Sequence, residues 1–177
     1  PIYVMDGYGR YLPAANRFPS GFKALGDYIH GLGLKFGIYS CAGSYTCQGR
    51  PGSKGHQFQD ALQYARWGVD YLKYDWNLND EWWMRDMKEA LDATGRDIVY
   101  SISNKARVAM GPVYAKYAEC WRTTGDIRDT WESMATIGFQ GQDKWAGYRE
   151  SGKWPDADML VLGKVGWGRK DHWTKLT

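Results

Sequence analysis

The stretch GVDYLKYDWNLN, residues 68–79, decides how the chain is interpreted. Val69 and Leu72 indicate a buried strand, yet Lys73 and Asp75 interrupt its last third. Lysine and aspartate are seldom buried without a partner. Because side chains on a strand alternate between its two faces, these two charged groups point the same way. The pattern predicts a strand whose carboxyl end presents a polar, functional face.

Four further segments are short apolar runs of the same kind. They are LKFGIYS (34–40), DIVYSIS (97–103), AECWRTT (118–124) and DMLVLG (158–163). Continuous apolar runs, rather than strict alternation, are typical of parallel strands covered on both faces. We therefore predict a parallel sheet.

Helical patterns, with apolar residues three and four positions apart, lie between these runs. They extend from Phe22 to Leu32, from Phe58 to Ala65, from Trp83 to Leu91 and from Ile127 to Ile137. Glycine follows each pattern as a stop signal, and Ser20 is a candidate N-cap of the first helix. Strands alternating with helices, about thirty residues per pair, predict right-handed crossovers in one α/β domain over residues 1–177.

Two architectures fit this order of elements: an open doubly wound sheet or part of a (β/α)₈ TIM barrel. A nucleotide-binding open sheet should carry a glycine-rich turn after its first strand, and neither G-x-G-x-x-G nor a P-loop occurs. Polar residues instead follow strand after strand, and in a barrel those strand ends converge on one face. We favour part of a barrel.

The bulk composition narrows the classes of function. The chain has 177 residues, a net charge of +3 and no cluster of Lys and Arg, so nothing indicates a nucleic-acid partner. No apolar run is long enough for a membrane span. The three Cys and three His lack the spacing of metal ligands, so no metal site is indicated. Ten Trp and thirteen Tyr fit either sugar stacking or large core residues.

Two carboxylates at the predicted strand ends suit glycoside hydrolysis, which needs one ionised nucleophile and one proton donor. Asp75, in line with Lys73, is the candidate nucleophile, and Asp126, after Gly125, is the candidate acid/base. Each has a structural alternative. Asp75 could form an ion pair with Lys73, and Asp126 could cap a helix beginning near Ile127.

The sequence resembles family 27 of the glycoside hydrolases, the α-galactosidase family. The matching segments are RFPSGFKALGDYIHGLGLKFGIYS, TCQGRPGSKGHQFQDALQYARWGVDYLKYDW, GRDIVYSIS, WRTTGDIRDTWESM and WPDADMLVLGKVGWG. The resemblance implies a retaining enzyme on a barrel, with no metal or cofactor, that acts on a galactoside or oligosaccharide. It gives Asp75 in K-Y-D the role of nucleophile and Asp126 in R-x-x-x-D that of acid/base. The sugar-binding residues would be Lys73, Arg122 and Tyr39.

The resemblance also implies that the two carboxyl groups lie about 5–5.5 Å apart, as retention of configuration requires. Secretion to the periplasm or medium is the family expectation for location. The family's default sugar is α-D-galactose, and β-L-arabinopyranose or N-acetylgalactosamine are the alternatives.

Several positions depart from the family pattern. The family usually links the Cys of its T-C motif, here Cys47, to a position that holds Asn77, so that bridge is impossible, while a Cys41–Cys47 pair stays open. Ser103 stands where the family contacts the 2-position of the sugar, and Trp76 could stack on an aglycone or pack under a helix. Asp158 is expected to be a structural acid or, less readily, a substrate contact.

In family terms the chain runs from just after strand two to strand seven. A five-stranded segment leaves raw sheet edges, so we expect the isolated chain to be inactive or weakly folded unless the missing strands or a second copy complete the barrel. A sugar-binding remnant without activity is therefore a second hypothesis. A third, weaker one is a phosphate-binding open sheet, based on the segment GSYTCQGRPGSKG.

Overall fold

The computed structural model describes residues 3–75, 80–103, 105–128 and 130–157. The chain divides into two compact units, Pro1–Ile102 and Ser103–Thr177, which are described separately. Among the described residues, no helix has the length and apolar character that crossing a membrane requires.

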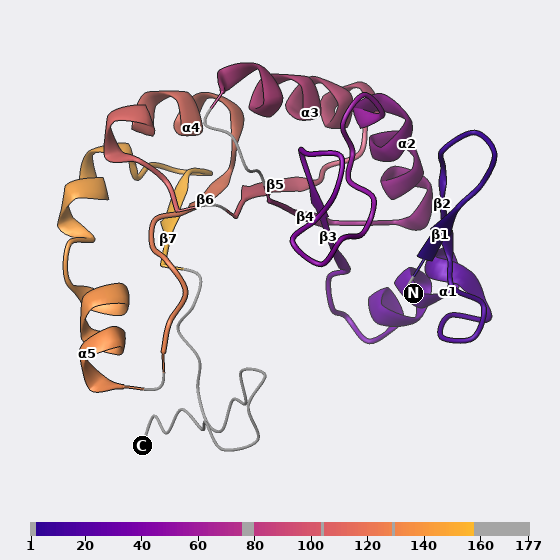
Figure 1. Ribbon diagram of the computed structural model, residues 1–177, viewed down its shortest axis with the longest axis horizontal. Coiled ribbons are helices and arrows are strands. Elements are labelled where there is room, and N and C mark those ends of the chain that lie inside the picture. The colour runs from indigo at the N-terminus through magenta and orange to yellow at the C-terminus, as the bar shows by residue number, and fades with distance from the viewer. Residues whose placement is uncertain (1–2, 76–79, 104, 129, 158–177) are drawn as a thin grey trace. The chain divides into compact units, whose positions relative to one another are not determined.

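The first unit alternates strands and helices (Figure 1). A short antiparallel hairpin comes first, and a β-α-β-α-β series follows it. The elements are β1 (Tyr3–Met5), β2 (Tyr11–Pro13), α1 (Gly21–Gly31), β3 (Gly37–Cys41), α2 (Gln57–Trp67), β4 (Tyr71–Asp75), α3 (Glu81–Ala93) and β5 (Val99–Ile102). Strands β3, β4 and β5 are parallel, with Tyr39 opposite Lys73 and Lys73 opposite Ser101.

The second unit contains shorter elements. They are η1 (Val108–Met110), α4 (Gly111–Tyr117), β6 (Cys120–Arg122), α5 (Trp131–Met134), the π-helical η2 (Ala135–Phe139), η3 (Asp143–Tyr148) and β7 (Trp154–Asp156). Strands β6 and β7 are parallel, with Arg122 opposite Asp156. Within each unit the neighbouring strands follow chain order, β3-β4-β5 in the first unit and β6-β7 in the second, as expected when each crossover adds the next parallel strand.

Helix α3 follows its predicted apolar stripe. Trp83, Met84, Met87 and Leu91 are all at most 3% exposed. Helix α2 does not follow its stripe, because Phe58 and Leu62 are 58% and 44% exposed. The face of α2 that is buried carries Gln57, Asp60, Ala61, Tyr64 and Trp67. The predicted core face of α2 is therefore wrong, although the helix itself is where the pattern placed it.

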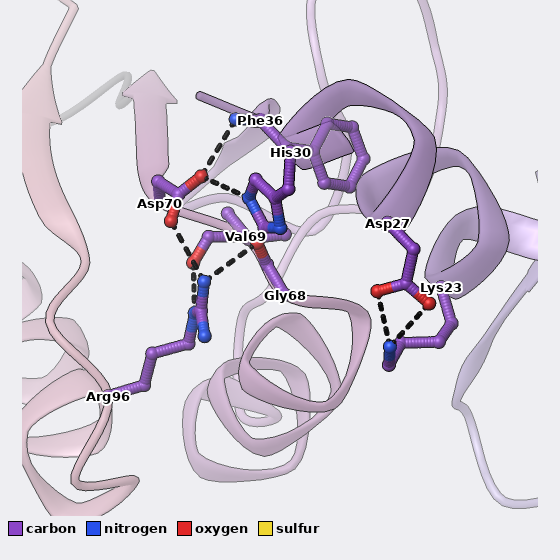
Figure 2. Close-up of polar contacts among 8 residues, drawn as sticks. All are labelled: Lys23, Asp27, His30, Phe36, Gly68, Val69, Asp70 and Arg96. Carbon is purple, nitrogen blue, oxygen red and sulfur yellow. Dashed lines mark hydrogen bonds and ion pairs between the residues drawn. The ribbon is translucent and has the colours of Figure 1, made fainter. Parts of the chain in front are cut away.

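A polar clamp joins the amino ends of β3 and β4 in the first unit (Figure 2). The Asp70 carboxylate accepts hydrogen bonds from the Phe36 N–H at 2.8 Å and from Arg96 Nη2 at 2.8 Å, and it contacts His30 Nε2 at 2.7 Å. Arg96 also donates to the carbonyls of Gly68 and Val69. Burial alone would raise the pKa of Asp70, but the Phe36 N–H and His30 together lower it.

The core of the second unit is aromatic. Trp121 of β6 and Trp145 of η3 have ring centroids 6.5 Å apart, and Tyr114 of α4 stacks on Trp121 at 6.3 Å. All three side chains are at most 1% exposed. Of the two explanations offered for the many Trp and Tyr residues, sugar stacking and core packing, core packing accounts for these three.

Ser20 occupies the N-cap position of α1, as predicted, but its side chain makes no capping hydrogen bond. Asp126 caps no helix either, since α5 begins at Trp131 and Thr130 accepts the hydrogen bond from the Ser133 N–H. The predicted strand 158–163 lies outside the described residues, and β7 is found just before it.

Candidate active site

The carboxyl end of β4 brings Tyr39 and Asp75 together. The Tyr39 hydroxyl donates to Asp75 Oδ2 at 2.8 Å and lies 3.8 Å from the Cys47 sulfur. Lys73 is the direct cross-strand partner of Tyr39, and Cys41 that of Asp75. Because alternate residues share a face, Tyr39, Lys73 and Asp75 are on one side of the sheet. Three of the predicted residues thus form one cluster.

The environment of this cluster favours a protonated phenol and an oriented carboxylate. Burial first, and the contact with Asp75 second, raise the pKa of Tyr39 well above the ordinary phenol value. Tyr39 therefore remains a hydrogen-bond donor across the physiological range of pH. The Ala42 N–H also donates to the Asp75 backbone carbonyl at 2.7 Å, which fixes the strand end that carries the carboxylate.

The three cysteines are free thiols, so the Cys41–Cys47 disulfide that the sequence left open does not form. Burial raises the pKa of the Cys41 thiol. Cys47 is exposed, beside Tyr39. Among the described residues, no group of three or more His, Cys, Asp or Glu side chains has the arrangement of a metal site.

The second unit carries the other predicted pair. Arg122 Nη2 lies 2.5 Å from Asp126 Oδ1, with the Arg122 side chain 13% exposed and that of Asp126 63% exposed. Thr123 and Thr124 anchor the loop between them, because their hydroxyls donate to the carbonyls of Asp156 and Ala157. A buried guanidinium thus holds an accessible carboxyl group after β6.

The remaining predicted site residues have different outcomes. Ser103 is buried, at 5% exposure, directly after β5. Trp76 and Asp158 lie outside the described residues, as does Asn77. Asp75 belongs to the first unit and Asp126 to the second, so their predicted separation stays a prediction.

The first unit also has a largely apolar pocket of about 500 Å³ beside β3. Its lining includes Phe18, Phe22, Phe36 and Tyr39, with Arg17 and Arg50. Of the predicted site residues only Tyr39 contributes to it. A smaller polar pocket of about 250 Å³ in the second unit is lined by Thr123, Thr124 and Gly125, among others, but not by Arg122 or Asp126.

Sequence reasoning missed a set of buried polar side chains directly behind the cluster. Asp60 of α2 and Ser53 are completely buried. Ser40 of β3 and Tyr74 of β4 are each only 1% exposed. The available signal was the spacing of Asp60, Tyr64 and Trp67 along α2, which puts the acid on the face that also carries two large aromatic residues.

A family model described as alpha galactosidase A matches residues 3–177. "Alpha-galactosidase 2" of Arabidopsis thaliana is 44% identical over 172 residues, covering 94% of this chain and 43% of that protein. The "Alpha-N-acetylgalactosaminidase" of Gallus gallus is 39% identical over 175 residues, covering 91% of this chain and 43% of that protein. The chain therefore spans about two fifths of the length of the curated relatives it matches.

Among solved structures, a family 27 β-L-arabinopyranosidase from Geobacillus stearothermophilus, in complex with arabinose, aligns with a TM-score of 0.85. It is 31% identical, and the match covers 98% of this chain and 52% of that chain. Five parallel strands with flanking helices, matched to such a barrel enzyme, make this chain part of a (β/α)₈ barrel. The predicted fold class is confirmed.

Proposed function

Because the chain belongs to glycoside hydrolase family 27, the alpha-galactosidase A family, we propose that it is the catalytic part of a retaining hydrolase that releases terminal α-D-galactose. The observation that carries the proposal is the hydrogen bond of 2.8 Å from Tyr39 to Asp75 at the K-Y-D end of β4. A carboxylate whose second oxygen is oriented by a half-buried phenol is well placed to attack with its other oxygen.

In the proposed mechanism, Asp75 attacks the anomeric carbon as Asp126 gives its proton to the leaving oxygen. The C–O bond to the aglycone breaks, and a covalent galactosyl-enzyme forms. Asp126, now ionised, takes a proton from water, which attacks the anomeric carbon and releases Asp75. Two displacements leave the configuration of the sugar unchanged.

Lys73 and Arg122 are proposed to hold the sugar, with Tyr39 orienting the nucleophile. The guanidinium of Arg122 would also keep the Asp126 carboxyl in place through their contact of 2.5 Å. Cys47, Ser103, Trp76 and Asp158 are proposed as further substrate contacts. The activity, the sugar and export to the periplasm or medium are proposals about the intact protein.

A second specificity has support from a particular finding. The solved relative with a TM-score of 0.85 is a β-L-arabinopyranosidase in complex with arabinose. β-L-Arabinopyranose differs from α-D-galactose by the loss of the exocyclic carbon, so both fit the same two-carboxylate chemistry. Parallel assays on the two nitrophenyl glycosides distinguish them by the ratio of kcat/KM.

Chemical rescue tests the two carboxylate roles in the intact protein. Asp75→Ala and Asp126→Ala should each lower kcat on a nitrophenyl α-galactoside by at least about 1,000-fold, and azide should restore turnover in both. Asp75→Ala should then yield the β-galactosyl azide, and Asp126→Ala the α-galactosyl azide. Asp27→Ala, at an exposed acid of α1, is the control. Equal activity in the Asp75 variant and the parent would refute the mechanism, and sugar binding without turnover in the parent would favour the non-catalytic remnant.

A further inference from the structure

A group of buried polar side chains lies behind the candidate nucleophile. This group, the β3–β4 cage, consists of Ser40, Ser53, Asp60, Tyr64 and Tyr74. Each is buried, with Asp60, Ser53 and Tyr64 at 0% exposure. The Ser40 and Ser53 hydroxyls lie 3.1 Å apart. Neither carboxylate oxygen of Asp60 has a hydrogen bond of ordinary geometry, nor do the Tyr64 and Tyr74 hydroxyls.

Such a cage requires a functional or structural reason. An unsatisfied buried polar atom costs about 1–3 kcal/mol, and an unpaired buried carboxylate costs far more. Replacement by apolar residues of the same size would avoid that cost. Most native buried polar groups find partners, so a cluster of exceptions marks a place where a polar function is retained.

The carboxyl group of Asp60 is neutral at mildly acidic pH. Burial raises the pKa of Asp60 to about 7, and the Ser53 hydroxyl lowers it only in part. The titratable groups that act on the cage tyrosines are Asp60 itself, the phenols Tyr11 and Tyr100, and the Cys41 thiol. None of these neighbours is a cation, so nothing among them stabilises an ionised Asp60.

The cage is connected to the nucleophile through the sheet itself. Ser40 and Tyr74 are cross-strand partners, and they alternate in sequence with Tyr39 and Asp75. The two faces of the same strand ends therefore carry the cage on one side and the Tyr39–Asp75 hydrogen bond on the other. A shift of the cage would move the nucleophile with it.

The loop after β3 forms backbone hydrogen bonds to the carboxyl ends of β3 and β4. The Ser53 N–H donates to the Cys41 carbonyl at 2.8 Å, and the Ala42 N–H donates to the Asp75 carbonyl at 2.7 Å. The Asp60 N–H donates to the His56 carbonyl at 2.9 Å, at the start of α2. Helix α2, the loop and both strands thus meet at the cage.

We propose that Asp60 is a positioning residue for the candidate nucleophile: through the β3–β4 cage it holds the carboxyl ends of β3 and β4 in register, and with them the contact between Tyr39 and Asp75. This role rests on the proposed function, but its structural part can be tested without a substrate. A neutral carboxylic acid can donate one hydrogen bond and accept others, so it can interact with hydroxyl groups on more than one side. Ionisation of Asp60 removes the donor and loosens the strand ends.

Amide hydrogen exchange in the intact protein provides the test. The Ala42 amide reports the carboxyl end of β4, and the Val99 amide, which donates to the Asp70 carbonyl at 2.9 Å, reports its amino end. Asp60→Ala should lower the protection of Ala42 about 10-fold or more relative to Val99. Asp60→Asn, which keeps the shape and a donor, should stay within about 3-fold of the parent. Equal losses at both amides would mean a general role in stability and would overturn the proposal.

A pH series covers the case in which Asp60→Ala does not fold. The protection of Ala42 in the parent, corrected for intrinsic exchange, should fall as the pH rises past about 7, whereas in Asp60→Asn it should not. If the protection of Ala42 depended on pH in the same way in the parent and in Asp60→Asn, the proposal would be overturned. kcat should fall about 10-fold to 100-fold in Asp60→Ala and recover in Asp60→Asn, with KM nearly unchanged. If the parent hydrolyses no glycoside, the proposed function fails while the exchange ratio still decides the role of Asp60.

Discussion

Replacing Asp60 by Asn should change how the stability of the protein depends on pH. The folded state holds this carboxyl group at a pKa of about 7 because it is buried, whereas an unfolded chain has it near 4. Between these values the folded protein keeps a proton that the unfolded chain has released. Raising the pH therefore favours unfolding, and the stability contributed below about pH 4 is lost as the pH rises through 7.

The expected magnitude follows from the two pKa values. Their difference corresponds to about 4 kcal/mol of unfolding free energy, lost at about 1.4 kcal/mol for each pH unit between about pH 4 and pH 7 and nearly constant above it. Asn has the same shape but no proton to lose. The free energy of unfolding of Asp60→Asn minus that of the parent should therefore rise by about 4 kcal/mol from pH 4 to pH 8, whether the variant is more or less stable than the parent at pH 4.

Urea unfolding of the two proteins at half-unit steps of pH measures this difference directly, because all titrations common to both cancel. Asp27→Asn is the matched control, since Asp27 is a helical acid whose side chain is 58% exposed and pairs with Lys23. A pH dependence for Asp60→Asn no larger than that for Asp27→Asn would refute a neutral, buried Asp60 and with it the pH-dependent part of the cage.

Two other substitutions test the local packing of the first unit. Asp70→Asn should lower the free energy of unfolding by about 2–3 kcal/mol, because Arg96 and His30 lose a charged acceptor. The folded state lowers the pKa of Asp70. The loss of stability should therefore be present above about pH 4 and shrink at lower pH, where Asp70 is protonated in both the folded and the unfolded state. Gly52→Ala should lower the stability by about 2 kcal/mol or more in thermal melts, because a Cβ there would lie 2.1 Å from the Gly43 carbonyl oxygen and 2.5 Å from the Cys41 sulfur. Gly31→Ala is the control, since a Cβ at Gly31 has open space around it, and it should be neutral or stabilising in the same measurement.

The sequence predicted the elements best where one signal dominated. The strand that ends in Lys73 and Asp75 is a compact apolar run, and most apolar residues of α3 lie on one face. The face of α2 was mispredicted because apolar residues occur on both sides of the helix. Periodicity locates a helix, but tertiary packing decides which face is buried when both are apolar.

Short elements were missed for a different reason. Strand β7 has three residues and contains Pro155, which lacks the N–H of a regular ladder, and α4 is only seven residues long. Neither length supports a periodic signal. Of the candidate site, the residue types and the alternation on β4 led to Lys73 and Asp75, and the family resemblance added Tyr39. The cage depends on contacts between α2 and the sheet that no local pattern encodes.

The two acids near the end of β4 illustrate how one sheet can separate two kinds of carboxyl chemistry. Asp75 is half-buried and accepts the Tyr39 hydroxyl at 2.8 Å, so one carboxylate oxygen is held in place beside a solvent-accessible strand end. Asp60, on the other side of the same strands, has no cation beside it and no water-exposed surface, which suits a group that must stay neutral. Environment sets the role of a carboxyl group more than its identity does. Because Ser40 and Tyr74 alternate with Tyr39 and Asp75 along the strands, a change of charge on the cage side would reach the candidate nucleophile by displacement of the strand ends, not only through the electric field.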